Sequence, residues 1–275
     1  MADSLAEPEP ERVVRLAGVV LAAGAGVRLR PLSAWRPKAL CPIGATTLVD
    51  RAVAQVAAVT GTPVAVNVHH GRPAMVEHLE DRIDVHVSLE EERALGTAGA
   101  IAHLAGFLDG RGALVVNADT VHAEDLRAFV GGWDGRRVRV LATPDPTTCA
   151  DGGDQFGPRS GIVASIVPWE HVQALVPEPS GLWELLWRPE LEAGRLDVVM
   201  ATGTVIDCGT PEQYLRANLW VSGGRSVIGA GAVVRGRLER SVVWPGATVE
   251  DHEHLIDAIR ADPGPRGPGG TVLIR

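Results

Sequence analysis

The chain has 275 residues, 45% of them hydrophobic and 22% charged, a composition typical of a globular protein that can bury a sizeable core. Its net charge of −8 argues against a nucleic-acid-binding or anionic-membrane-binding surface, and no apolar run is long enough to cross a bilayer. Cys41, Cys149 and Cys208 are widely spaced, which argues against a disulfide framework or a zinc site and predicts reduced thiols in a cytoplasmic protein.

The N-terminal segment, residues 1–11, is acidic and proline-rich. We expect a disordered leader there and not a signal peptide. The continuous apolar run at 13–24 follows and ends in glycines, which is typical of a strand buried on both faces of a parallel sheet.

Strands and helices alternate along the next part of the chain. We expect strands at 13–24, 62–70, 83–90, 112–119 and 138–143, and helices at 46–59, 72–81 and 96–108. This order predicts a doubly wound α/β domain with a mostly parallel sheet. Ligands of such sheets bind beyond the carboxyl ends of the strands, where Asp119 and the glycines after the first strand should lie.

Charge is unevenly distributed along the chain. No Asp or Glu occurs from residue 12 to residue 49, yet this stretch carries Arg28, Arg30, Arg36 and Lys38, and Lys38 is the only lysine in the protein. Because Gly24 and Gly26 let backbone N–H groups turn outward, this stretch predicts an anion-binding loop. It matches neither the dinucleotide pattern nor the P-loop, since the third glycine and the Lys-Ser or Lys-Thr pair are absent.

The sequence pattern changes after about residue 221. Ile228 and Val234 are six residues apart, as are Val243 and Val249, with small turn residues between them. This spacing predicts a short parallel β-helix, with a pair of ordinary hairpins as the alternative, and the final TVLIR predicts a terminal strand.

The run GAGVRLRPLSAWRPKALCPIG resembles the signature of the sugar-1-phosphate nucleotidyltransferases, G-x-G-T-R-L-x-P-L-T and, after a gap, P-K. LGTAGA, VVNAD and VIDCGTPEQYLRA continue the resemblance in the family's order. The C-terminal repeat is similar to the β-helix of many mannose-1-phosphate guanylyltransferases. The resemblance covers most of residues 13–260 and implies a Rossmann-like nucleotidyltransferase domain at 12–220, followed by a short left-handed parallel β-helix region at 221–275.

Enzymes of this family join a nucleoside triphosphate to a sugar-1-phosphate and release pyrophosphate. The resemblance implies that Asp119 and Asp207 are catalytic and bind Mg²⁺, that Arg28 holds the triphosphate and that Lys38 lies between the reacting phosphates. It also implies contacts to the nucleotide and the substrate: Leu21, Ala22, Ala23, Gly24, Gly26, Gly96, Thr97 and Ala98 for the nucleotide, and Asn117 and Gly161 for the substrate.

The LGTAG turn and the C-terminal repeat favour GTP and a mannose-type sugar-1-phosphate as the substrates. A β-helix edge often serves as an oligomer contact, so we expect a homo-oligomer. Two departures from the family pattern leave alternatives open. Val27 replaces the usual Thr or Ser, and the segment from Thr143 to Ser160 lacks the Glu-Lys pair that many relatives use to hold the sugar. The alternatives are uridylyl or thymidylyl transfer to another sugar or to a cyclitol phosphate, and a catalytically silent regulatory subunit.

Three other groups are interpreted as non-catalytic. His69 and His70 are expected to form a loop pair, Trp183 and Trp187 a packed helix face, and the glutamates at 90–92 a solvent-facing run.

Overall fold

The computed structural model describes residues 15–147, 155–261 and 270–274, so the expected leader at 1–11 lies outside the described residues. Within them, the largest sheet has seven strands in this order: β10 (Asp197–Met200), β8 (Arg139–Ala142), β9 (Ile162–Val167), β6 (Gly112–Asn117), β1 (Leu16–Leu21), β4 (Val64–Val68) and β5 (Val85–Leu89). Every pairing is parallel except the two that β9 makes with β6 and β8. The predicted α/β fold with a mostly parallel sheet is confirmed.

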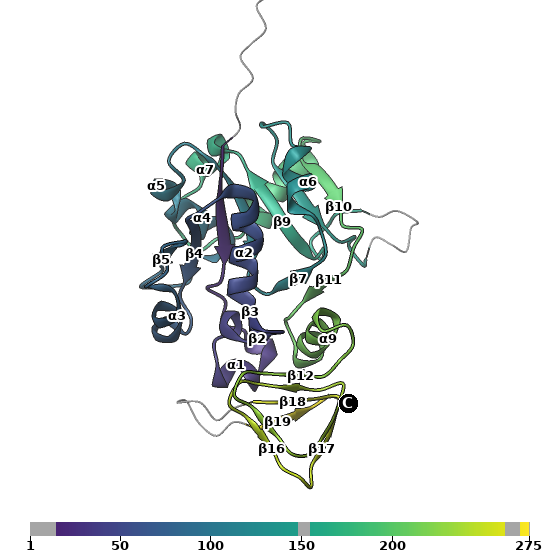
Figure 1. The fold of residues 1–275 in the computed structure, drawn as a ribbon. Coiled ribbons are helices and arrows are strands. Elements are labelled where there is room, and N and C mark those ends of the chain that lie inside the picture. Colours follow the sequence, from purple (N-terminus) through teal and green to yellow (C-terminus); the bar gives the residue numbers. More distant parts are fainter. Residues whose placement is uncertain (1–14, 148–154, 262–269, 275) are drawn as a thin grey trace, which may run out of the picture.

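Helices cover both faces of this sheet, which gives three layers (Figure 1). One face packs against α2 (Leu48–Thr60), α3 (Arg72–Leu79) and α6 (Leu126–Gly131). The other face packs against α4 (Gly96–His103), α5 (Ala105–Leu108), α7 (Trp169–Ala174) and the π-helical turn η4 (Trp183–Trp187), which α8 (Arg188–Glu192) continues. Strands buried on both sides need apolar residues at every position, which explains their continuous apolar runs.

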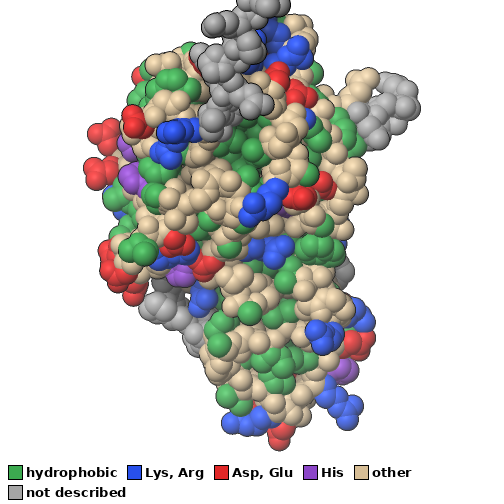
Figure 2. All heavy atoms as spheres, turned by 45° about the horizontal axis from the view of Figure 1, so that its top comes forward, with side chains coloured by type: hydrophobic (Ala, Val, Ile, Leu, Met, Phe, Trp, Pro, Cys, Tyr) green, Lys and Arg blue, Asp and Glu red, His purple; other side chains and the backbone are tan. Residues whose placement is uncertain are grey.

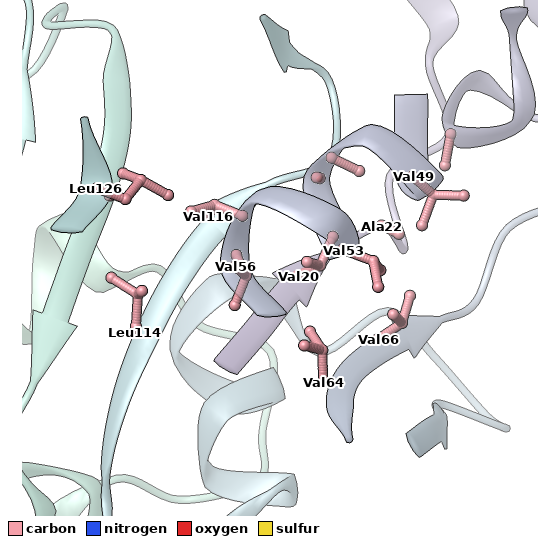
Figure 3. Close-up of a cluster of buried hydrophobic side chains, with 14 of the residues drawn as sticks. Val20, Ala22, Val49, Val53, Val56, Val64, Val66, Leu114, Val116 and Leu126 are labelled. Atoms are coloured by element: carbon pink, nitrogen blue, oxygen red, sulfur yellow. The ribbon is translucent and has the colours of Figure 1, made fainter. Parts of the chain in front are cut away.

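The central helix α2 shows how tightly these layers pack. Its valines Val53 and Val56 are fully buried and point toward Val20 of β1 and Val64 of β4 (Figure 3). Burial of each such side chain contributes about 1.5–3 kcal/mol. A Cβ on Gly18 of β1 would lie 2.3 Å from a methyl group of Val56, so only glycine lets the helix approach this closely.

The segment between β1 and α2 forms a series of short elements: η1 (Val27–Leu29), α1 (Leu32–Trp35), η2 (Lys38–Leu40), β2 (Pro42–Ile43) and β3 (Thr46–Thr47). Beyond β6, the short strand β7 (Thr120–His122) pairs antiparallel with β11 (Val205–Asp207). Helix α9 (Pro211–Val221) follows β11 and begins at the Thr210 N-cap, whose hydroxyl accepts a hydrogen bond from the Gln213 N–H.

The C-terminal part consists of short strands: β12 (Val227–Ile228), β13 (Val233–Val234), β14 (Arg237–Glu239), β15 (Val242–Val243), β16 (Thr248–Val249), β17 (His254–Ile256), β18 (Ala258–Arg260) and β19 (Thr271–Leu273). β12, β15 and β18 pair in parallel, as do β13 with β16 and β14 with β17, and β19 adds antiparallel to β18. These strands outline a triangle below α9 in Figure 1. The expected terminal strand is confirmed, and Ile228 and Val234 lie on successive strands, as the six-residue spacing predicts.

A hydrophobic cluster joins this part to the rest of the molecule. It contains Trp244, which directly follows β15, together with Tyr214 from α9, Ile206 from β11 and Leu32 from α1. The indole of Trp244 donates a hydrogen bond to the Tyr214 hydroxyl over 3.0 Å, and that hydroxyl donates to the Pro42 carbonyl. The C-terminal strands therefore brace the segment that carries Lys38.

On the face seen in Figure 2, basic and acidic side chains are interspersed. In the C-terminal part, ion pairs such as Arg240–Asp257 and Arg235–Glu250 join opposite charges between the short strands. None of the helices in the described ranges has the length and hydrophobicity that a bilayer-spanning helix requires.

Candidate active site

A cavity of about 690 Å³ opens at the carboxyl ends of β1, β4 and β6. Most of the residues that the sequence singles out line it: Leu21, Ala23, Gly24, Arg28, Gly96, Thr97, Asn117, Asp119, Gly161 and Asp207. The topology explains this meeting, because parallel strands bring their carboxyl ends to one edge of the sheet.

Lys38, Asp119 and Asp207 form a cluster of opposite charges at this cavity. The Lys38 ammonium donates a hydrogen bond to the Asp119 carboxylate and lies 3.6 Å from Oδ1 of Asp207. Only 10% of the Lys38 side chain is exposed, whereas the Asp119 and Asp207 side chains are 33% and 42% exposed. The two carboxylates thus face the cavity, and the lysine approaches them from inside the protein.

Backbone pairing around β7 and β11 holds Asp119 and Asp207 close together, although they are far apart in the sequence. In the β7–β11 ladder Asp207 lies opposite Thr120, and the Cys208 N–H donates to the Asp119 carbonyl over 2.9 Å. Gly209 permits the close approach of Arg28, because a Cβ there would lie 2.9 Å from Asp207 Oδ2 and 3.0 Å from an Arg28 guanidinium nitrogen.

The two glycines of the loop have different roles: Gly26 packs against Lys38, and Gly24 lines the cavity. Gly26 has a left-handed backbone (φ 62°), and a Cβ there would lie 2.9 Å from Lys38 Cβ. Gly24 has open space around it and lines the cavity. Arg28 is 68% exposed at its side chain, and its guanidinium lies 3.4 Å from Asp207 Oδ2, so it is free to contact an anionic ligand.

The LGTAG turn is anchored from behind by the segment before η4. The Ala98 N–H donates to the Ser180 carbonyl over 3.0 Å, and the Leu182 N–H donates to the Thr97 hydroxyl over 2.8 Å. Cβ atoms at Gly96 and Gly99 would lie 2.4 and 2.1 Å from the carbonyl oxygens of residues 180 and 178. Both glycines of the turn are therefore required by close backbone contact.

Two residues named for nucleotide contact use their backbone N–H groups inside the protein. The Ala22 N–H donates to Asn67 Oδ1 over 2.7 Å, and the Ala98 N–H is occupied by Ser180. Neither residue lines the cavity, nor do Gly26 and Lys38, although the Lys38 ammonium contacts Asp119, which does. Their proposed contacts to a nucleotide remain predictions.

The expectation that the glutamate run at 90–92 faces solvent is wrong for Glu90. Glu90 is 2% exposed; its carboxylate accepts hydrogen bonds from Asn67 Nδ2 (2.7 Å) and from the Leu95 N–H (2.8 Å). Asn67 in turn lines the cavity and binds Ala22. This buried chain of hydrogen bonds connects the glycine loop to the LGTAG turn, so that both keep a fixed spacing.

Several cavity residues were not singled out as site residues by the sequence analysis: Asn67, His70, Thr143, Gln213 and Arg216. Asn67 had a usable signal, because it lies in the second expected strand, near the edge where ligands bind. His70 lies in the expected loop, with Nδ1 2.8 Å from the Ala23 carbonyl. Gln213 and Arg216 also had a signal, because both lie within the VIDCGTPEQYLRA motif, and Thr143 ends an expected strand.

Burial determines the protonation of Cys41 and Cys208, two cysteines near the cluster. It raises the pKa of the Cys41 thiol from 9.0 to about 12 and also raises the pKa of Cys208. Both thiols are fully protonated at neutral pH and are poor nucleophiles or metal ligands. In the described part of the chain, no group of three or more His, Cys, Asp or Glu side chains is arranged to hold a metal ion.

Comparisons with known proteins agree with this geometry. Residues 17–147 match the family model described as nucleotidyl transferase. The chain is 31% identical over 227 residues to N-acetylmuramate alpha-1-phosphate uridylyltransferase of Caulobacter vibrioides, an alignment that spans 72% of this chain and 94% of the relative. It is 34% identical over 126 residues to mannose-1-phosphate guanylyltransferase of Mycobacterium tuberculosis, across 44% of this chain and 35% of that relative.

Solved structures share the fold at low sequence identity. HddC from Yersinia pseudotuberculosis, complexed with GMP-PN, superposes with a TM-score of 0.57 at 18% identity, over 74% of this chain and 97% of that one. UDP-glucose pyrophosphorylase from Acinetobacter baumanii gives a TM-score of 0.58 at 14% identity, over 76% and 93% of the two chains.

Proposed function

The chain belongs to the nucleotidyl transferase family and is a sugar-1-phosphate nucleotidyltransferase, and from this premise we propose how its own residues carry out the reaction. The phosphate oxygen of the sugar-1-phosphate attacks the α-phosphorus of the nucleoside triphosphate. A new P–O bond forms, the bond to the β-phosphate breaks, and pyrophosphate leaves. The attacking oxygen is already anionic at neutral pH, so no general base is required.

The ion-paired cluster of Lys38 with Asp119 and Asp207, the two carboxylates that line the cavity, carries this proposal. Two like-charged phosphates must approach each other, and a fixed cation between them lowers the repulsion in the transition state. Lys38 is well placed for this because its compact ammonium is held from inside the protein. We assign Arg28, exposed at the cavity, to the triphosphate, since a guanidinium can bind phosphate oxygens in a bidentate manner.

The residues present fit a Mg²⁺ ion. Mg²⁺ takes one or two carboxylates and completes its coordination with water and substrate phosphates, so the pair Asp119 and Asp207 suffices without a third acid. Both carboxylates are partly exposed to the cavity. When bound, the ion would neutralise phosphate charge. Lys38 contributes a second positive charge beside the same carboxylates.

We propose the remaining cavity residues as binding groups. Leu21, Ala23, Gly24, Gly96 and Thr97 are assigned to the nucleotide, and Asn117 and Gly161 to the sugar phosphate. Gly161 is held in place by Thr143, whose hydroxyl accepts from the Gly161 N–H over 2.8 Å.

For the base, uridine is our first candidate, because the Caulobacter relative named as a uridylyltransferase aligns over nearly its whole length. Guanosine with a mannose-type 1-phosphate is the second candidate, supported by the guanylyltransferase relative. We further propose that the parallel C-terminal strands form a short β-helix, that the protein is a homo-oligomer and that it acts in the cytoplasm. The parallel ladders that repeat on three sets of short strands support the first of these.

The test is pyrophosphate release in the presence of Mg²⁺, with UTP, GTP, dTTP, CTP and ATP, each against a panel of sugar-1-phosphates and cyclitol phosphates. We expect release with one nucleotide–acceptor pair and an NDP-sugar of the matching mass. Silence across the whole panel, with nucleotide binding confirmed by calorimetry, would favour the regulatory subunit instead.

A further inference from the structure

Arg216 lines the catalytic cavity but has no part in the reaction as assigned so far. It lies on α9 and is exposed, and among the described residues its guanidinium has no hydrogen-bond or ion-pair partner. A guanidinium stays charged at neutral pH and carries five N–H donors. An arginine at a cavity wall without a partner is therefore available to an anionic ligand.

The charges around the reacting centre balance without Arg216. The Lys38 ammonium pairs with Asp119 and lies 3.6 Å from Asp207. The Arg28 guanidinium lies 3.4 Å from Asp207, so two cations face two carboxylates and leave no net positive charge for the incoming phosphates. Two guanidinium groups line the cavity within the described chain, those of Arg28 and Arg216, and the second forms no ion pair there.

Helix α9 stands on the side of the cavity to which the triphosphate is assigned. A Cβ on Gly209, two residues before the helix, would lie 3.0 Å from an Arg28 guanidinium nitrogen. Further along the helix, the Tyr214 hydroxyl donates to the Pro42 carbonyl, so α9 packs against the segment that carries Lys38. The residues assigned to the sugar phosphate lie instead at the end of β6 and beside β9.

A second residue on the same face of α9 also lacks a partner. Gln213 lines the cavity three positions before Arg216, so the two side chains are neighbours on the helix surface. The Oε1 atom of Gln213 is buried and has no hydrogen-bond partner among the described residues. Buried polar atoms are nearly always satisfied, so a donor is expected to reach this oxygen when the site is occupied. One N–H of Arg216 can do so after a change of rotamer, and its other donors remain for a ligand.

We propose, on the basis of the function proposed above, that Arg216 binds the β- and γ-phosphates of the triphosphate, the part that leaves as pyrophosphate. Arg28 and Arg216 then hold this group from two different chain segments, the glycine loop and α9. Gln213 is a positioning residue, which holds the Arg216 guanidinium in the bound state. Because the same contacts are made to the bound triphosphate and to pyrophosphate, they strengthen binding and leave the chemical step nearly unchanged.

The test measures KM for all four substrates of the reversible reaction, with the nucleotide–acceptor pair that the enzyme accepts. The forward substrates are the triphosphate and the sugar-1-phosphate, and the reverse substrates are pyrophosphate and the NDP-sugar. The β- and γ-phosphates occur together only in the triphosphate and in pyrophosphate. Arg216→Ala should raise KM for these two by about 10- to 100-fold, the loss expected for hydrogen bonds to a charged group. KM for the sugar-1-phosphate and the NDP-sugar, and kcat, should stay within a few-fold of wild type.

Further variants separate charge, geometry and folding. Arg216→Lys keeps the charge but loses the planar fork, and it should recover part of the lost affinity. Arg127→Ala removes an exposed arginine of α6 that lies outside the cavity, and it should leave all four KM values unchanged. An unchanged Tm serves as the control for folding, which the exposure of Arg216 makes the expected result.

Gln213→Met tests the positioning role. It removes the amide oxygen at similar length and should raise the same two KM values by about 2- to 10-fold, the loss of one ordinary hydrogen bond. In the Arg216→Ala background it should have no further effect, because Gln213 acts through Arg216. Independent effects of the two changes would overturn the positioning role.

The outcomes separate this inference from the function on which it rests. Turnover by Arg216→Ala with all four KM values unchanged overturns the assignment of Arg216 and leaves nucleotidyl transfer standing. A rise in KM for the sugar-1-phosphate and the NDP-sugar, with the other two unchanged, also overturns it, because Arg216 would then bind the acceptor phosphate. Failure of the wild-type protein to release pyrophosphate with any pair overturns the function and this inference together.

Discussion

The ammonium of Lys38 lies against the carboxylate of Asp119, although the two residues are 81 positions apart in the sequence. Lys38 is positioned by the left-handed turn at Gly26, and Asp119 lies just beyond the end of β6. The lysine side chain is nearly buried, so its charge acts in a medium less polar than water, where it is worth more.

Replacement of Lys38 by alanine should lower kcat by about 10²- to 10³-fold, as loss of one preorganised group that stabilises transition-state charge does. Lys38→Arg should not restore the rate, because the wider guanidinium does not fit between the Asp119 and Asp207 carboxylates where the compact ammonium lies. Steady-state rates measure the effect, and unchanged circular dichroism serves as the control for folding. A wild-type rate in Lys38→Ala would contradict the role assigned to it.

Gly99→Ala should destabilise the protein by about 1–3 kcal/mol, because the new Cβ would lie 2.1 Å from the Glu178 carbonyl oxygen and neither backbone can move freely. Gly106→Ala is the matched control: it also lies in a helix, on the same face of the sheet, but no atom lies within 4 Å of its Cβ position. It should be neutral or stabilising by up to about 1 kcal/mol. Denaturant unfolding measures both, and equal effects would show that the close contact is not what requires the glycine.

Asp50 is expected to make stability depend on pH. Burial alone would raise the pKa of its carboxyl, but hydrogen bonds from Thr47 and His78 and the charges of His78 and Arg82 outweigh burial and hold this pKa below its ordinary 3.8. A carboxyl with a depressed folded-state pKa contributes stability above its unfolded pKa, and this contribution is lost as the pH falls through the folded value.

Asp50→Asn should therefore lower the Tm at neutral pH by about 2–4 °C, and the difference should shrink as the pH falls below 3.8. Asp81→Asn, at an exposed position after α3, is the control and should leave the Tm unchanged. A difference that stays constant down to strongly acidic pH would assign the effect of Asp50 to packing and not to its charge.

Cys41 and Cys208 should resist alkylation in the folded protein. Both are buried, and the pKa of Cys41 is raised to about 12, so the thiolate that reacts is scarce as well as inaccessible. Treatment with iodoacetamide at about pH 8, followed by peptide mass spectrometry, should show these two positions modified only after denaturation. Rapid modification in the native state would mean that the segment that carries Lys38 opens easily.

Local pattern was enough to predict much of the fold. Continuous apolar runs predicted β1, β4 and β6, and the acids and glycines after them fall at the cavity because all parallel strands end at the same edge. The expected strands do not include β9. Its antiparallel direction is not predictable from an apolar run either, because strand direction depends on the connections between strands.

The interior of the site was less predictable. Glu90 looks like one of three solvent-facing glutamates, and only the fold brings it to Asn67, 23 residues earlier in the chain. Trp183 and Trp187 were correctly predicted as a packed helix face, yet their spacing does not show that they line a smaller cavity beside the catalytic one. Such contacts join distant segments, and neither periodicity nor a motif encodes them.

The most direct test of the account is the rate of pyrophosphate release by Asp119→Asn and Asp207→Asn, measured against wild type with the accepted nucleotide and sugar-1-phosphate. Each asparagine keeps the shape of the side chain and removes the charge that holds Lys38 and would hold Mg²⁺. We predict that both variants fold normally and lose about 10²- to 10³-fold or more in kcat. A wild-type rate in either variant would contradict the assignment of nucleotidyl transfer to this cluster.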